Sequence, residues 1–331
     1  MKRVFISMFI ALMAITTVQA QQISVVAENG TTTLYRTLQD AIEGAPGGSV
    51  IYLPSGGFQI SDDVKISKKL TIIGIGHKAV SENADGNTTI AGNLWFNEGS
   101  SGSAVMGCYI SGNVNIAENG PVNGMLVCFC NLNSIQITNS ECTGTVIKQN
   151  YIRAGSNFGN SEVTINNNVI GKIQNVGTGV ISYNTVCHSC SGAARYSQYY
   201  RTLENVNNST IIGNIFRIGE SPSLYFCSVS SCNISGNLCV GWSIGDVPVT
   251  IDAGADNIFV NANGWSISPF SDFHFKKEYK EYETQVGIYA GPEPFDDKQM
   301  APVPYIIEKK VDSQTDASGQ LNIKIRVKAS E

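Results

Sequence analysis

Charged residues are scarce in this sequence of 331 residues and make up 15% of the chain. Lysine and arginine together number 22, they form no basic tract, and the formal net charge is −5. Proteins that grip nucleic acid through its phosphates need clustered cations. We therefore expect no nucleic-acid partner.

Long apolar runs are also absent, apart from one at the N-terminus. Met1-Lys2-Arg3 precede an apolar stretch that reaches about Ile15, and the small-residue pattern Val18-Gln19-Ala20 follows. This order predicts a secretory signal peptide over residues 1–20. The run is too short for a comfortable membrane span. We predict export to the extracellular space, the periplasm or the outer surface, with no membrane span. Cleavage would remove the two positive charges of Lys2 and Arg3, so the net charge would change from −5 for the whole chain to −7 for the mature protein.

Helical periodicity is confined to one short segment, about residues 36–45. Four apolar residues share one helical face there, namely Leu38, Ala41, Ile42 and Ala45. Thr37 is placed to cap this helix, with Asp40 three residues on. Elsewhere short runs of valine, isoleucine and threonine alternate with turn residues, which is typical of an all-β protein. We expect the helix to cover an open end of that structure.

An apolar-polar-apolar step that leads to an asparagine recurs through the middle of the chain. The asparagines are Asn150, Asn168, Asn184, Asn214 and Asn237. A period near 20 residues with three short strands per turn is that of a β-helix coil. Inward asparagines on stacked strands can bond to those above and below, so these five are interpreted as a structural ladder. The steps at Ile135/Ile137 and Val163/Ile165 are predicted to supply inward aliphatic columns. The alternative, plain turn residues in a β-sandwich, offers no reason for this period.

Two stretches add a resemblance to a known family. The runs Thr37–Ile42, Pro46–Gly48, Val50–Pro54 and Leu70–Gly76 resemble the opening of right-handed parallel β-helix proteins of the pectin-lyase-like superfamily, of the secreted bacterial type. Residues 270–275 and 286–291 resemble the closing coil of such proteins, although a charged run over 276–283 replaces the usual Gly-Ser-Pro-Ala step. The resemblance implies a right-handed parallel β-helix over residues 21–291.

The C-terminal part differs in character from this body. Residues 292–304 are rich in proline and are predicted to form a linker. Residues 305–331 hold two segments that alternate with period two around a turn, which predicts a β-hairpin appendage. Its outward Lys324, Arg326 and Lys328 are charges that discourage edge pairing.

Nine cysteines in an exported chain leave at least one unpaired within a monomer. Local disulfides at Cys187/Cys190 and Cys227/Cys232 are one interpretation, and buried free thiols are the other. Cys108 and Cys128 lie about one coil apart and are predicted to stack as buried thiols.

No catalytic set typical of this fold is visible. A calcium-dependent lyase needs converging carboxylates on adjacent coils and a base. Asp252 and Asp256, with Asp246 nearby, have no matching pair of carboxylates one coil earlier. Calcium binding is therefore only weakly supported, and we expect no cofactor. A hydrolase of this fold would show a Gly-His-Gly step, which is missing. His77 is interpreted as a surface turn residue and His274 as a packed one.

The interval from Asn184 to Asn214 is about ten residues longer than a coil needs. Its excess carries Arg195, Tyr196, Tyr199, Tyr200 and Arg201. Insertions in solenoids often leave the coil as loops over the binding face. Tyrosine rings can stack on sugars and arginine can fork onto carboxylates. A self-packed loop that covers the side of the solenoid is the alternative.

Together these features predict a secreted or cell-surface protein without catalytic activity. We expect it to present a face to a polysaccharide or a cell-surface glycan, in the manner of an adhesin, with the five insertion residues as candidate ligand-binding residues. One alternative is a polysaccharide lyase or glycoside hydrolase whose catalytic residues go unrecognised. Another is a purely structural surface protein. No oligomeric state is predicted.

Overall fold

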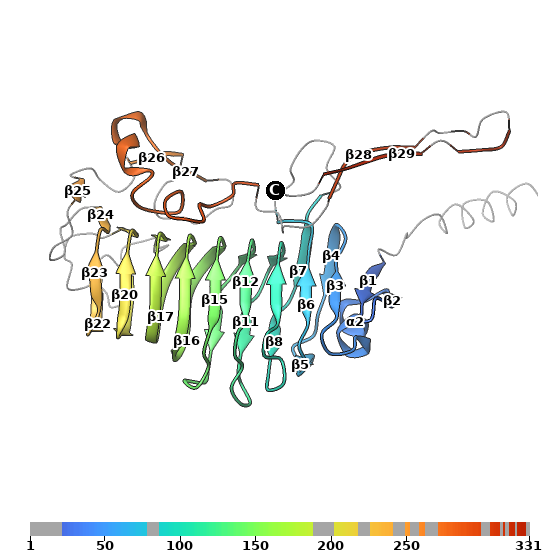
Figure 1. Cartoon of the computed structure of the whole chain (residues 1–331), viewed down its shortest axis with the longest axis horizontal. Helices are drawn as coiled ribbons and strands as arrows, with labels where there is room; N and C mark the ends of the chain where they lie inside the picture. The colour runs from blue at the N-terminus through green and yellow to red at the C-terminus, as the bar shows by residue number, and fades with distance from the viewer. Residues whose placement is uncertain are drawn as a thin grey trace, which may run out of the picture.

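The computed structural model describes residues 22–77, 86–187, 202–217, 226–240, 249–251, 258–261, 271–298, 305–311, 314, 318–321 and 323–328. Strands β1 to β25 form one 25-stranded sheet, and its strands stand side by side along the long axis of the molecule (Figure 1). The pairings within this sheet are parallel except those that join β1 to β2 and β3. No helix in these ranges is long and apolar enough to cross a membrane.

The parallel strands fall into three stacks. Stack 1 comprises β3 (Val50–Tyr52), β6 (Thr71–Ile73), β9 (Ala104–Met106), β12 (Leu126–Cys128), β15 (Thr145–Lys148), β20 (Ser209–Ile212) and β23 (Asn233–Ser235). Stack 2 comprises β4 (Gly56–Gln59), β7 (Thr88–Ala91), β10 (Tyr109–Ile110), β13 (Asn131–Leu132), β18 (Thr185–Val186), β21 (Ile215–Arg217), β24 (Leu238–Val240) and β25 (Val249–Ile251). Stack 3 comprises β5 (Lys65–Ile66), β8 (Leu94–Phe96), β11 (Val114–Ile116), β14 (Ile135–Ile137), β19 (Leu203–Asn207) and β22 (Phe226–Ser230). The long strands β16 (Tyr151–Asn166) and β17 (Val169–Ser182) take part in all three stacks.

Each strand pairs with the strand that occupies the same place in the next repeat. Val114, for example, lies opposite Leu94 of the preceding repeat and Ile135 of the following one. The structure is therefore all-β with a large, mostly parallel sheet, as predicted. Three strands per repeat with this pairing are compatible with a solenoid.

Period-two alternation explains the interior. Successive side chains of a strand point to opposite faces, and the inward ones form one continuous hydrophobic core. Ile135, Ile137, Val163 and Ile165 are all fully buried in this core, which confirms the predicted aliphatic columns. Burial of each such side chain contributes roughly 1.5–3 kcal/mol.

The N-terminal segment combines an antiparallel pair with the predicted helix. Strands β1 (Ile23–Val26) and β2 (Thr32–Tyr35) precede helix α2 (Leu38–Gly44). The Thr37 hydroxyl oxygen accepts the backbone N–H of Asp40 at 3.1 Å and so caps the helix as expected. The apolar face of α2 packs into the same core as β1.

The corner between stacks 1 and 2 has a repeated two-residue geometry. Seven residues at this corner adopt positive φ between 52° and 67°, namely Gly107, Phe129, Gln149, Asn167, Tyr183, Gly213 and Gly236. In the last five repeats of this series the next residue is a ladder asparagine whose side chain points inward. Each carboxamide oxygen of Asn168, Asn184, Asn214 and Asn237 accepts two bonds from the preceding asparagine, one from backbone N–H and one from Nδ2, at 2.8–3.0 Å.

The cysteines correct one expectation. Cys108 lies opposite Cys130 in the register, whereas Cys128 lies opposite Met106. Cys108 and Cys130 therefore continue the asparagine column toward the N-terminus, and the predicted stacking of Cys108 on Cys128 is wrong. The reason is a repeat of 22 residues at this point, where 20 was assumed. Free thiols are found at Cys108, Cys128, Cys130, Cys142, Cys227, Cys232 and Cys239, so the Cys227/Cys232 disulfide is not formed, and Cys190 lies outside the described residues.

The C-terminal part does not close the sheet as another coil. Strand β26 (Phe259–Asn261) pairs antiparallel with β27 (Asp272–Phe275) in a separate two-stranded sheet, followed by the 3₁₀ helix η3 (Lys277–Tyr282). Figure 1 shows these elements outside the large sheet. The expected closing coil is thus replaced by a return segment, residues 271–298, that doubles back along the outside.

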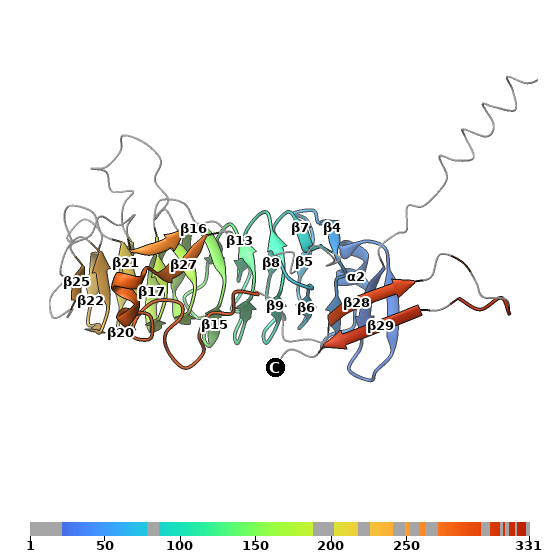
Figure 2. The ribbon, with the colours of Figure 1, turned by 90° about the horizontal axis from the view of Figure 1, so that it is seen from above.

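The predicted hairpin pairs as its alternation implies. Strands β28 (Tyr305–Val311) and β29 (Ile323–Lys328) form an antiparallel sheet of two strands. Figures 1 and 2 show it at the end of the molecule that carries β1, β2 and α2. Lys324 and Arg326 are exposed, and Ile323 and Ile325 expose the opposite, apolar face of β29.

Candidate functional site

The return segment follows the corner between stacks 1 and 2 and is held there by polar bonds. The Gly287 N–H donates to the Gly213 carbonyl at 2.7 Å. Asn167 Nδ2 donates to the carbonyls of Ile288 and Ala290 at 2.8 and 2.9 Å. These bonds satisfy main-chain groups of a segment that has few ladder partners of its own.

Apolar contacts explain why the chain turns back here. The residue after each ladder asparagine points outward from stack 2, and several of these residues are apolar. Tyr151, Val169, Ile215 and Leu238 form a second buried cluster with return-segment side chains, which include Phe273, Phe275, Val286, Ile288 and Phe295. The ring of Phe295 meets that of Tyr151 edge to face, with centroids 5.2 Å apart. The return segment covers an outward apolar row that water would otherwise reach.

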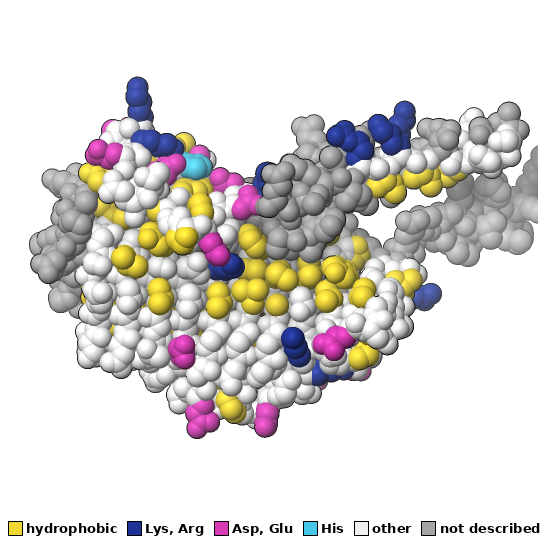
Figure 3. Space-filling model, in the orientation of Figure 1, with side chains coloured by type: hydrophobic (Ala, Val, Ile, Leu, Met, Phe, Trp, Pro, Cys, Tyr) yellow, Lys and Arg dark blue, Asp and Glu magenta, His cyan; other side chains and the backbone are white. Residues whose placement is uncertain are grey.

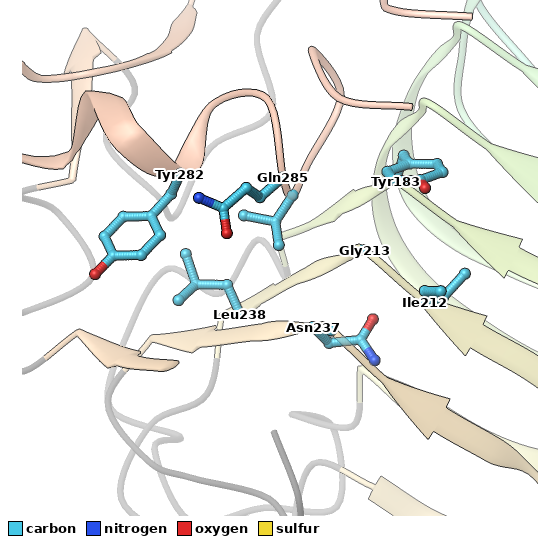
Figure 4. Close-up of a pocket in the computed structure, with 9 residues that line it drawn as sticks. Tyr183, Ile212, Gly213, Asn237, Leu238, Tyr282 and Gln285 are labelled. Carbon is cyan, nitrogen blue, oxygen red and sulfur yellow. The ribbon is translucent and has the colours of Figure 1, made fainter. Parts of the chain in front are cut away.

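A cavity of about 270 Å³ opens where the return segment meets the sheet (Figure 4). It is lined by Tyr183, Ile212, Gly213, Gly236, Asn237, Leu238, Tyr282, Gln285 and Val286. No charged residue is among them. Two phenol rings, two amides and aliphatic side chains therefore surround an uncharged space.

Tyr183 is fixed in its place by two glycines. A Cβ atom added to Gly213 or to Gly291 would lie 2.5 Å from a carbon of the Tyr183 ring. The ring thus fits between the next repeat and the return segment only because both neighbours are glycine. Figure 4 shows Tyr183 and Tyr282 on opposite sides of the cavity.

Tyr282 and Gln285 come from the end of η3 and the turn after it. The Gln285 side chain donates to the Glu281 carbonyl at 2.8 Å, which orients its amide at the cavity. Partial burial raises the pKa of Tyr282, and so does the neighbouring Glu281 carboxylate, which also accepts a hydrogen bond from the phenol. The phenol oxygen can in addition accept a hydrogen bond.

A second polar group lies on the same segment around His274. Its Nδ1 is 3.0 Å from Glu283 Oε1, and its Nε2 is 3.3 Å from Asp297 Oδ2. The imidazole stacks on the ring of Tyr289 with centroids 3.9 Å apart, and the Tyr289 hydroxyl donates to Asp297 at 2.7 Å. Burial, together with that carboxylate, raises the pKa of Tyr289.

The interactions around His274 hold parts of the return segment together. Both ring nitrogens face carboxylate oxygens, so neither is turned toward the cavity as a general base would need to be. Burial tends to raise the pKa of Glu283, but hydrogen bonds from Lys280, His274 and the Phe275 N–H outweigh it and lower the pKa. Within the described residues, no group of three or more His, Cys, Asp or Glu is arranged to hold a metal ion.

The candidate residues from the sequence have mixed outcomes. Arg195, Tyr196, Tyr199, Tyr200 and Arg201 lie outside the described residues, as do Asp246, Asp252 and Asp256. The interpretation of His77 as a surface residue is wrong, because it is buried with its ring centroid 5.6 Å from that of Tyr151. Its burial follows from the covering of the outward row by aromatic side chains.

Tyr183, Tyr282 and Gln285 were missed by sequence reasoning. One signal was available: an inward asparagine followed by an apolar residue implies an outward apolar row, which a later segment must cover. Which later segment, and in which register, is a tertiary property. Comparisons with family models, curated proteins and solved structures found no match to this chain.

Proposed function

We propose that this chain is a secreted or cell-surface protein that binds a neutral carbohydrate, without catalysis, through the cavity between Tyr183 and Tyr282. In this proposal the fold is a right-handed parallel β-helix like those of the pectin-lyase-like superfamily. The signal peptide directs export, α2 caps the N-terminal end, and the hairpin is an appendage. The role is adhesin-like.

One observation carries the proposal. The cavity combines phenol rings with the Gln285 amide, lies between the sheet and the return segment, and contains no charged lining residue. Tyrosine offers an apolar ring face and a polar hydroxyl, which match the apolar faces and hydroxyl groups of a sugar. Because Tyr183 is wedged between glycines, the site is largely preformed, and binding costs little ordering entropy.

The absence of charge in this lining favours a neutral glycan. An acidic sugar buried here would lose hydration without gaining a cation, which is unfavourable. The acidic character of the chain, with a net charge of −5, works in the same direction. Acidic glycans would instead favour the insertion with Arg195 and Arg201, which remains a candidate site within this proposal.

Glycan-array binding of residues 21–331 tests the proposal, with tyrosine variants as probes. Tyr282→Ala is expected to weaken binding of neutral glycans by roughly tenfold or more, since truncation of a central aromatic anchor typically costs about 2 kcal/mol or more. Tyr282→Phe, which keeps the ring, is expected to retain most of the affinity. Tyr279→Ala, on the same 3₁₀ helix but outside the cavity lining, is the control for local disturbance.

Three outcomes would contradict it. Unchanged binding by Tyr282→Ala combined with Gln285→Ala would remove this cavity as the site. Loss of binding in Tyr199→Ala with Tyr200→Ala, but not in Tyr282→Ala, would transfer the site to the insertion. Release of unsaturated or reducing ends from a polysaccharide would establish an enzyme.

A further inference from the structure

A second cavity, of about 460 Å³, lies near the N-terminal end of the sheet. It is lined by Gln22, Ser24, Tyr52, Leu53, Pro54, Ile73, Gly74 and Ile75. Like the first cavity, it combines a tyrosine and a glutamine with aliphatic side chains and has no charged lining residue. Tyr52 keeps 39% of its surface exposed, so its ring is available to a ligand.

Strand register builds this cavity from three neighbouring strands. Tyr52 on β3 lies opposite Ser24 on β1 and opposite Ile73 on β6. Antiparallel pairing on one side and parallel pairing on the other hold these three positions side by side. The Tyr52 ring is therefore supported by a continuous sheet.

The two cavities lie at opposite ends of one straight row of stack 1. From Tyr52 the paired positions run through Ile73, Met106, Cys128, Lys148, Asn166 and Ser182 to Ile212, which lines the first cavity. Seven steps of about 4.8 Å between neighbouring strands give a separation of about 34 Å along the sheet. Parallel pairing without a break in register keeps the row straight.

Ile73, Cys128 and Ser182 in this row are buried. The exposed surface between the cavities is therefore formed mainly by the adjoining row, and it is apolar and close to charge-neutral. The adjoining row, two residues earlier in each strand, is formed by Ala104, Leu126, Val146, Thr164, Val180 and Thr210. Figure 3 shows hydrophobic side chains as a band across this face. The one charged residue in these two rows, Lys148, is paired with Glu293 at 2.6 Å.

We propose that the N-terminal cavity is a second carbohydrate site and that both cavities bind the same neutral, linear polysaccharide. This inference rests on the proposed function of the first cavity. The apolar band receives the C–H faces of the sugar rings between the two sites, and threonine hydroxyls along it bond to sugar hydroxyls. Once one cavity is filled, the second binding event is intramolecular, so affinity rises without new kinds of contact.

The composition of the band favours a glycan over a second copy of this chain. Protein interfaces have an apolar centre with charged residues depleted and large aromatic anchors present. Here the accessible positions include the aliphatic residues Leu126, Val146 and Val180 together with Thr164, Asn166 and Thr210. The band therefore offers an apolar surface together with hydrogen-bonding side chains at Thr164, Asn166 and Thr210.

Calorimetric titration with size-fractionated neutral glucan, mannan and xylan tests the inference. For the polysaccharide that binds, fractions long enough to span about 34 Å are expected to bind on the order of 10²-fold or more tightly than short ones. Tyr52→Ala is expected to abolish this gain and to leave short-fraction binding at the first cavity in place. Tyr52→Phe, which keeps the ring, is expected to preserve the gain.

Leu34→Ala is the matched control, because Leu34 is 56% exposed on the neighbouring strand β2 but does not line the cavity. An unchanged long-chain gain in Tyr52→Ala would overturn the second site while the first stands. Absence of any Tyr282-dependent carbohydrate binding would instead overturn the proposed function. Self-association of the wild type that Tyr52→Ala abolishes, measured by sedimentation, would assign the face to a second copy and overturn the inference.

Discussion

Cys130 lies directly next to Asn150 in the interior column, and its backbone N–H donates to the Asn150 carboxamide oxygen at 2.9 Å. Its thiol donates to the carbonyls of Cys128 and Val105 at 3.2 and 3.7 Å, as the Nδ2 group of a ladder asparagine donates to backbone carbonyls. A thiol is a weak acceptor, so the ladder loses its strong acceptor at this repeat. Burial raises the pKa of Cys130 to about 12, which keeps the thiol neutral.

Cys130→Asn is expected to stabilise the protein. The new carboxamide oxygen faces the backbone N–H of Cys108 in the preceding repeat, and its Nδ2 faces Asn150 Oδ1. Each added bond contributes about 1 kcal/mol, so the midpoint of chemical unfolding is expected to rise. Cys142→Asn is the control, because Cys142 is buried outside this column and an amide there should destabilise. A lower midpoint for Cys130→Asn would contradict the ladder argument.

Asn184→Ala is expected to be strongly destabilising. Its carboxamide oxygen accepts both donors of Asn168, and its Nδ2 donates to the Asn214 oxygen and to two carbonyls. Each buried group left unsatisfied costs about 1–3 kcal/mol, so a total of about 3 kcal/mol or more is expected from urea unfolding. Asn133→Ala removes a half-buried carboxamide that bonds Asn113 and is expected to cost about 1 kcal/mol. Equal effects of the two changes would argue against the interior ladder.

Gly291→Ala is expected to loosen the return segment. The new methyl would lie 2.5 Å from the Tyr183 ring, and the residue has φ of +84°. Overpacking of this kind costs typically about 1–3 kcal/mol. Limited proteolysis within residues 271–298 is expected to accelerate, and neutral-glycan binding is expected to weaken.

Gly30→Ala separates the clash from the backbone effect. Gly30 has nearly the same φ, +83°, but a Cβ there would meet no atom within 4 Å. It is expected to cost only the left-handed backbone penalty of about 1–2 kcal/mol and to leave proteolysis of the return segment unchanged. If both variants changed proteolysis of the return segment equally, the close contact between Gly291 and the Tyr183 ring would not explain the effect.

Acid is expected to release the return segment through Glu283. Its pKa is lowered in the folded state, so ionised Glu283 stabilises the fold above the ordinary glutamate pKa, about 4.3. That contribution is lost as the pH falls through the lower folded value. Proteolysis of residues 271–298 in wild type should therefore rise steeply on acidification from about pH 5 downward.

Glu283→Gln provides the comparison. It removes the ionisable group that faces His274 and Lys280, so its return segment should be more susceptible at neutral pH and less dependent on acid. Asp62→Asn is the control, because the pKa of Asp62 is also lowered, by Asn93 and Trp95, but the residue lies in the N-terminal half, far along the sheet from η3. A wild-type acid profile in Glu283→Gln would disprove the role of Glu283.

Local and periodic features were predictable from sequence. The Thr37 cap, the inward columns at Ile135 and Val163, and the antiparallel pair β28–β29 each depend on neighbours close in the chain or on strict alternation. A capping residue or a period-two alternation has the same structural effect wherever it occurs in a chain, so residue type and spacing were sufficient to predict these features. The repeated asparagine phrase also marked the positions that carry the interior hydrogen bonds.

Only the tertiary structure decided which repeats align and what covers them. Turn lengths vary, so a spacing of 20 or 22 residues decides whether Cys108 meets Cys128 or Cys130. Tyr183 and Tyr282 are brought to one cavity because an outward apolar row at the corner must be shielded from water, and the return segment supplies the matching side chains. Their chain separation of about a hundred residues leaves no local signal, since hydrophobic contact is non-directional and selects partners only once the chain has folded.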